Sequence, residues 1–174
     1  MLLVFNLRVL ISVMLLTAGG AKVPALHTFH DTVMRFKVSD AAARRFALAI
    51  PVAELLVGAT LWIVGWYPWP EVATAVLGVG FVAANTWAIR HDLDASCGCF
   101  GAVADEPFGP WSLGRAISVC LGGIILIIAH PVVLRLSVLA QFLQAILSGG
   151  ILWLYAYGAS RQVHYPSKTP MPNS

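Results

Sequence analysis

The stretch that decides the fold is VATAVLGVGFVAANTWAI, which occupies residues 72–89 and contains no charged residue. Glu71 precedes it and Arg90 follows it. A helix of about 20 apolar residues crosses the hydrocarbon core of a bilayer, because each residue adds about 1.5 Å of length. The run therefore predicts a membrane-spanning helix, and similar apolar stretches lie on both sides of it.

The composition of the whole chain agrees with this interpretation. Of the 174 residues, 59% are hydrophobic and 11% are charged, whereas soluble domains carry about 25% charged residues. The net charge is +3, but no basic run is dense enough to indicate a nucleic-acid surface. The composition indicates an all-α integral membrane protein, with the lipid bilayer as its surroundings and nucleic acid excluded as a partner.

We predict a single helical domain over residues 1–161, built as a compact bundle of about five transmembrane helices. The expected spans are residues 2–21, 46–65, 72–89, 116–134 and 136–160. The basic segment 22–45 predicts an interfacial amphipathic helix, and residues 90–114 form a polar connection. Residues 162–174 are expected to be a short disordered tail.

Glu54 is the only acidic residue deep within a predicted span. A charge inside the membrane costs several kcal/mol unless it is paired or protonated, so Glu54 needs a partner. Lys22, Arg8 or a helix terminus near the 90–114 connection could supply one. Two roles remain open for Glu54 and Lys22: a structural ion pair, or handling of the proton released when thiols are oxidised.

The polar connection contains Cys97-Gly98-Cys99. Two cysteines one residue apart form a disulfide only under strain, and Gly98 makes the necessary backbone conformation accessible. A strained disulfide exchanges readily with thiolates. The pair is therefore interpreted as catalytic, although two ordinary thiols, a structural disulfide, or a metal site shared with His91 or a carboxylate remain open. Cys120 in the fourth span is either a small packing residue or a thiol that resolves a mixed disulfide with Cys99.

These residues resemble a known family. The similarity rests on Cys97-Gly98-Cys99-Phe100-Gly101, on Trp111 and Arg115, on Gly19-x-x-Lys22 with Phe29, and on Ile50-Pro51-x-x-Glu54-Leu55 with Gly58. Together, over about residues 10–130, they resemble the MauE proteins of methylamine utilisation, which are grouped with DoxX-like membrane proteins. The resemblance implies a DoxX-like four-helix core plus one helix.

The resemblance also implies a function: a membrane factor that matures the disulfide-rich small subunit of methylamine dehydrogenase beside a thioredoxin-like partner. The chain would then be a thiol-disulfide oxidoreductase, with membrane quinone as a possible electron acceptor by analogy with other membrane thiol oxidases and with no metal site. The alternatives are a non-enzymatic scaffold or chaperone for the partner, and a metal transporter.

The charges leave the orientation in conflict. The two long connections and the tail share one side and hold most of the Lys and Arg residues, so the positive-inside rule predicts that the cysteines face the cytoplasm. Stable disulfides form in oxidising compartments, which favours the opposite face. We expect the protein in the cell (inner) membrane with the cysteine loop on the extracytoplasmic face, because several basic residues belong to the interfacial segment.

Overall fold

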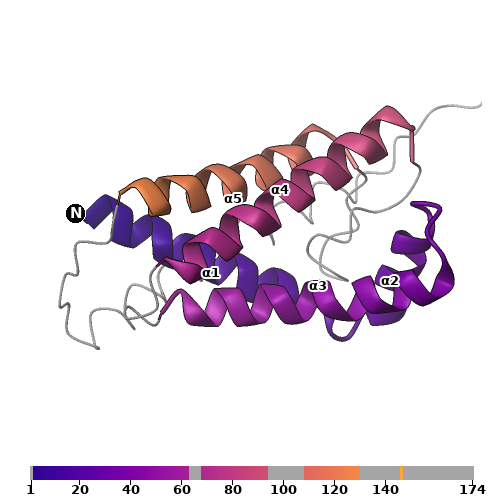
Figure 1. The fold of residues 1–174 in the computed structure, drawn as a ribbon, viewed down its shortest axis with the longest axis horizontal. Coiled ribbons are helices and arrows are strands. Elements are labelled where there is room, and N and C mark those ends of the chain that lie inside the picture. The colour runs from indigo at the N-terminus through magenta and orange to yellow at the C-terminus, as the bar shows by residue number, and fades with distance from the viewer. Residues whose placement is uncertain (1, 63–67, 94–107, 130–145, 147–174) are drawn as a thin grey trace, which may run out of the picture.

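The computed structural model describes residues 2–62, 68–93, 108–129 and 146, and every regular element with assigned bounds in them is a helix. In chain order these are α1 (Leu2–Lys22), α2 (Leu26–Met34), α3 (Asp40–Thr60), α4 (Trp69–Arg90) and α5 (Pro110–Ile128). Figure 1 shows α1, α3, α4 and α5 running along the long axis, with the short helix α2 at one end.

Three of the four long helices are long and apolar enough to cross a membrane: Leu3–Lys22, Trp69–Arg90 and Pro110–Ile128. The helix α3 is less apolar, because Arg44, Arg45 and Glu54 fall within its 21 residues. The prediction of an all-α membrane protein is confirmed. The fifth predicted span and the tail lie outside the described residues, apart from Ile146.

Among the helix starts, those of α3 and α5 differ most from the predicted spans. The helix α3 begins at Asp40 instead of residue 46, because Ser39 caps it by accepting a hydrogen bond from the Ala42 backbone N–H at 3.4 Å. The helix α5 begins at Pro110 instead of residue 116. Proline suits the first helical position because its φ is preset and the N–H it lacks has no partner there. Trp111 and Arg115 are thus helical residues.

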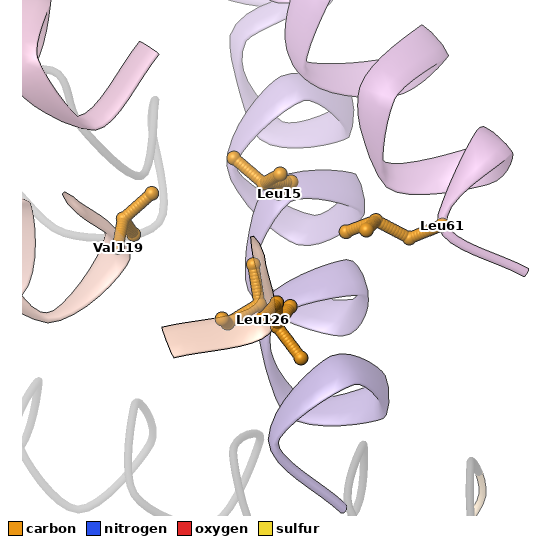
Figure 2. Packing of buried hydrophobic residues seen from close by; sticks show 5 residues of the cluster. Leu15, Leu61, Val119 and Leu126 are labelled. Atoms are coloured by element: carbon orange, nitrogen blue, oxygen red, sulfur yellow. The ribbon is translucent and has the colours of Figure 1, made fainter. Parts of the chain in front are cut away.

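Successive long helices run in opposite directions. The helices α1 and α3 pack as one antiparallel pair, and α4 and α5 form the most extensively packed pair. Between the pairs lies a core of buried side chains from α1, α5 and the residue after α3: Ile11, Leu15, Leu61, Val119 and Leu126. Figure 2 shows these side chains in the space between the helices. Large apolar side chains also point outward, as expected of a surface that faces lipid: Leu48, Leu56, Val76, Val79, Leu121 and Ile125.

Glycines allow the helices within each pair to approach closely. A Cβ added at Gly78 would overlap the backbone of Cys120, and one at Gly123 would lie 2.6 Å from the Ala75 backbone nitrogen. In the other pair, a Cβ added at Gly58 would lie 2.9 Å from Cγ of Leu16. Close backbone approach through small residues is a common way for helices to associate in lipid.

We predict that Gly78→Ala destabilises the bundle by about 1–3 kcal/mol, because the added methyl group forces α4 away from α5. The matched control is Gly80→Ala on the same helix, where an added Cβ meets nothing within 4 Å. That variant should be neutral or gain up to about 1 kcal/mol from its better helix propensity. Unfolding of the purified proteins in detergent, followed by circular dichroism, measures both. Equal stability of the two variants would contradict the close packing of α4 on α5.

Candidate functional site: a cavity beside a buried ion pair

Lys22 and Glu54 form a buried ion pair between α1 and α3. The Lys22 ammonium donates hydrogen bonds to both carboxylate oxygens of Glu54, with Nζ 2.6 Å from Oε1 and 2.8 Å from Oε2. The two side chains are 2% and 1% exposed. Two opposite charges removed from water in this way depend on each other, since either one alone would be an uncompensated buried charge. Lys22 is thus the partner of Glu54, the first of the three that the sequence suggested.

The surroundings of Lys22 involve two further helices. Its ammonium lies 5.7 Å from the ring centre of Phe29 on α2 and 5.8 Å from that of Phe81 on α4. Aromatic rings at this distance attract a cation through their negative faces. Lys22 is also the last residue of α1, at the helix C-terminus, where the helix dipole favours positive charge. One side chain thereby connects α1, α2, α3 and α4.

A second buried ion pair lies at the opposite end of α1, between Arg8 and Glu71. Nη2 of Arg8 is 3.0 Å from Oε1 of Glu71, and the side chains are 9% and 1% exposed. The two groups attract each other as opposite charges, but Nη2 of Arg8 and Oε1 of Glu71 do not have the geometry of a hydrogen bond. Arg8 Nε also donates to the Leu61 carbonyl at 2.6 Å. Arg8, considered from the sequence as a partner for Glu54, therefore pairs with Glu71 instead.

A cavity of about 330 Å³ opens beside the Lys22–Glu54 pair. Its walls come from the second half of α1, from α2, from the first part of α3, from the second half of α4 and from the first half of α5. Most of the lining is apolar and includes five phenylalanine rings: Phe29, Phe36, Phe46, Phe81 and Phe108. The polar lining residues are Lys22, Thr32, Glu54, Asn85, Ser112 and Arg115. A largely apolar cavity with a few convergent polar groups is the usual form of a small-molecule site.

A chain of aromatic contacts connects the two ends of the segment that carries the cysteines. His91, just after α4, stacks on Trp87 with ring centres 4.2 Å apart, and Trp87 stacks on Phe36 at 5.1 Å. Phe36 in turn meets the edge of Phe108, just before α5, at 5.8 Å. The chain leaves the described structure after Leu93 and returns at Phe108. These contacts fix the spacing of the two points from which the cysteine segment extends.

The cysteine pair itself, Cys97 and Cys99, lies outside the described residues, as do Gly98, Phe100 and Gly101. Of the remaining predicted motif residues, Arg115 lines the cavity, while Trp111 in the first turn of α5 is 76% exposed. Cys120 is a free thiol. It lies ten residues into α5, about 15 Å along the helix from Pro110, and its backbone forms the close contact with Gly78.

Sequence reasoning missed the role of Glu71 and of the aromatic residues Phe36, Trp87 and Phe108. One signal was present for the ion pairs. Arg8, Leu15 and Lys22 recur every seven residues, which places all three on one face of α1. That face also carries the apolar or small residues Ile11, Ala18 and Gly19, so it is the face expected to pack against other helices. Arg8 and Lys22 on this face therefore indicate two buried cations that need acidic partners.

Fold and site together define a multi-pass α-helical membrane protein with a cavity beside a buried Lys–Glu pair. The family model described as methylamine utilisation protein MauE matches residues 1–130, and the chain belongs to that family. It is also similar to the methylamine utilization protein MauE of Paracoccus versutus, with 28% identity over 170 residues that cover 94% of this chain and 89% of that protein. No solved structure matches the chain. Family membership links it to methylamine utilisation.

We predict that Glu54→Gln destabilises the protein by about 3–5 kcal/mol, because it leaves the Lys22 charge buried without its counter-charge. The double variant Lys22→Met with Glu54→Leu replaces both charges by apolar side chains. It should recover most of the wild-type stability. Unfolding in detergent compares the three proteins.

The control for this experiment is the exposed pair of Arg44 and Asp40, whose Nε and Oδ2 atoms are 2.9 Å apart. Arg44→Gln should change the stability by no more than about 0.5 kcal/mol, because exposed ion pairs contribute little. An equal loss in Arg44→Gln and Glu54→Gln would contradict the importance assigned to the buried pair.

Proposed function

We propose that the chain is a membrane maturation factor that supports disulfide formation, with Cys97 and Cys99 exchanging disulfides with a thioredoxin-like partner. The observation that carries the proposal is the Cys97-Gly98-Cys99 spacing within a MauE-family chain. A disulfide-containing client, such as an amine dehydrogenase subunit, is consistent with the link to methylamine utilisation.

The exchange begins with Cys97 and Cys99 joined as a disulfide. A thiolate of the reduced partner attacks one of the two sulfurs, a mixed disulfide forms, and the other cysteine leaves as a thiolate. The second thiolate of the partner then attacks the mixed disulfide. The partner leaves as a disulfide. The Cys97/Cys99 pair has gained the partner's two electrons and is left as a dithiol. The reverse direction reduces the partner, so the compartment and the electron acceptor decide which direction prevails.

The described residues supply two supports for this role. The aromatic chain from His91 to Phe108 connects the residues that flank the cysteine segment. The Lys22–Glu54 pair lines a cavity that Phe108 also lines. We assign to Lys22 and Glu54 the handling of protons released when the dithiol is oxidised, because they are a carboxylate and an ammonium in direct contact.

We place the protein in the cell membrane with the cysteine segment on the extracytoplasmic face. Disulfides persist in oxidising compartments, and a client that carries disulfides is matured there. The basic residues that argue for the opposite face include Arg35 and Lys37, which directly follow the short helix α2 and precede α3. Such residues are weak determinants of orientation if α2 lies in the membrane interface.

We predict that Cys97→Ser and Cys99→Ser each abolish oxidation of the thioredoxin-like partner in membranes and leave the helical bundle folded. Cys120→Ser is the matched control and should retain activity, because we assign the exchange to the two loop cysteines and Cys120 packs its backbone against Gly78 of α4. Alkylation of free thiols followed by gel electrophoresis reads the redox state of the partner. Normal oxidation by both loop variants would rule out thiol exchange.

The same variants separate exchange from a scaffold or chaperone that only holds the partner. A partner that lacks its second cysteine should be trapped as a mixed disulfide with the wild-type chain or with one of the single-serine variants. A scaffold yields no such adduct, although it still binds the partner. Co-purification under non-reducing conditions distinguishes the two roles.

We further predict that a membrane-impermeant maleimide labels Cys97 and Cys99 in intact cells after reduction and does not label them before it. Labelling reports accessibility from outside, and its dependence on reduction reports the disulfide. The double variant Cys97→Ser with Cys99→Ser, which keeps only Cys120, shows how much of the labelling comes from the third thiol. Labelling that appears only after the cells are broken would place the pair in the cytoplasm and reverse the assigned orientation.

A further inference from the structure

The cavity beside the Lys22–Glu54 pair runs along one half of the bundle. Its lining extends from Met14 to Lys22 on α1 and from Phe46 to Glu54 on α3. Eight residues of helix rise by about 12 Å. This length is close to the depth of one leaflet, because the hydrocarbon core of a bilayer is about 30 Å thick. The cavity is therefore elongated in the direction that an acyl chain takes within a leaflet.

The cavity is also narrow. A volume of about 330 Å³ spread over about 12 Å of helix leaves a section about 5 Å across. A helix with its side chains is about 10–12 Å wide, so a further helix does not fit. A single unbranched hydrocarbon chain does fit, since carbon atoms in contact lie about 3.5–4.0 Å apart.

The polar side chains of the lining already have partners within the protein. Lys22 and Glu54 bind each other, so their charges cancel. Arg115 has an interaction of its own. Three uncharged side chains donate to nearby backbone carbonyls: Thr32, Asn85 and Ser112. A ligand with hydrogen-bonding atoms would have to leave some of them without partners in this lining, whereas a hydrocarbon chain carries no such atoms.

The cavity reaches the outer surface of the bundle at Phe46. This side chain lines the cavity and is 50% exposed. It lies in the second turn of α3, toward the end of the bundle where α2 is found (Figure 1). Lipid chains are the most abundant apolar groups around a membrane protein, so mass action favours them as the occupant of a cavity that opens there.

Basic residues adjoin the lining at this entrance. Lys37 lies between Phe36 and Val38, and Arg45 directly precedes Phe46. The three apolar neighbours all line the cavity. Lys37 and Arg45 are exposed, and neither forms an ion pair with another residue in the part of the chain that the structure describes.

The acidic residues nearby in the sequence contact other side chains. Asp40 has Oδ2 2.9 Å from Nε of Arg44 and Oδ1 3.2 Å from Nε2 of His30. Asp31 lies 3.4 Å from Nδ1 of His27 and of His30. The charge that remains at the entrance is positive, and basic residues at a membrane surface attract the phosphates of anionic lipids.

We propose that the cavity binds one acyl chain of an anionic phospholipid, whose phosphate is held at Lys37 and Arg45. The chain enters beside Phe46 and ends near Leu15 and Val119, midway along α1 and α5. The second acyl chain stays in the bilayer. This site does not involve the cysteine chemistry, so it is tested separately from the proposed function.

The test uses two photoactivatable lipids with the full chain in lipid nanodiscs. Phosphatidylglycerol and phosphatidylcholine probes carry the same acyl chains, one of them ending in a diazirine, and differ in headgroup charge. Mass spectrometry of the digested protein locates the labelled residues after irradiation. Phosphatidylglycerol should label Leu15 or Val119, which are 2% and 6% exposed and out of reach of a lipid on the outer surface. Ile125, which is 47% exposed, reports general contact with lipid.

The headgroup decides how strongly the cavity is labelled. Relative to Ile125, the two buried residues should be labelled at least about fivefold more strongly by phosphatidylglycerol, because one basic residue near a membrane surface contributes about that factor. The double variant Lys37→Gln with Arg45→Gln should lose this preference. The control Arg90→Gln removes an exposed cation outside the cavity lining and should keep it. Equal labelling by the two probes, or an unchanged preference in the double variant, would overturn the assigned headgroup.

Two neighbouring alanines provide the matched variants for the acyl chain. Ala84 lines the cavity and Ala83 is exposed on the same helix. Ala84→Leu should lower the labelling of the two buried residues at least about tenfold by filling the cavity, while Ala83→Leu leaves it unchanged. Should Ala84→Leu fail to fold, Val33→Phe narrows the cavity from α2 and serves in its place. Labelling of Ile125 alone in the wild-type chain, or full labelling of the buried residues in both cavity variants, would overturn the proposal.

Discussion

The structure depends on one constraint, that a charge withdrawn from water must meet an opposite charge inside the protein. Lys22 and Glu54 satisfy it at 2.6 Å. The pairing holds the end of α1 against the middle of α3, because both side chains are buried and neither can be solvated by water instead. The position of Glu54 on α3 in turn places a polar wall in a cavity that is otherwise apolar. Stability and the candidate site thus share the same two residues.

The Arg8–Glu71 pair meets the same constraint at the other end of α1. Between the two pairs α1 contributes Ile11 and Leu15 to the core, and Ser12 donates a hydrogen bond to the Gly58 carbonyl at 2.6 Å. The bundle is therefore held by polar contacts at both ends of one helix and by apolar packing between them. The tight α4–α5 pair contacts this unit through Glu71 in the first turn of α4 and through Phe81 near the middle of α4.

The sequence was sufficient for the helical class, and it narrowed the partner of Glu54 to three candidates that included Lys22, because an isolated acid within an apolar run needs a counter-charge. It was insufficient for Glu71, which lies at the edge of an apolar run where a solvent-exposed flank is the ordinary interpretation. The start of α5 at Pro110 was missed because Pro-Trp-Ser suits a loop as well as a first helical turn. The cavity could not be predicted, since its walls come from five helices and neighbouring segments whose relative placement is a tertiary property.

The separation of the paired charges along the chain bears on how the protein enters the membrane. Lys22 and Glu54 are 32 residues apart, so α1 and α3 can neutralise each other as a hairpin before the later helices are made. Arg8 has no such early partner, because Glu71 begins the next long helix. A segment that ends before α4 therefore contains a balanced Lys22–Glu54 pair but lacks the carboxylate partner of Arg8.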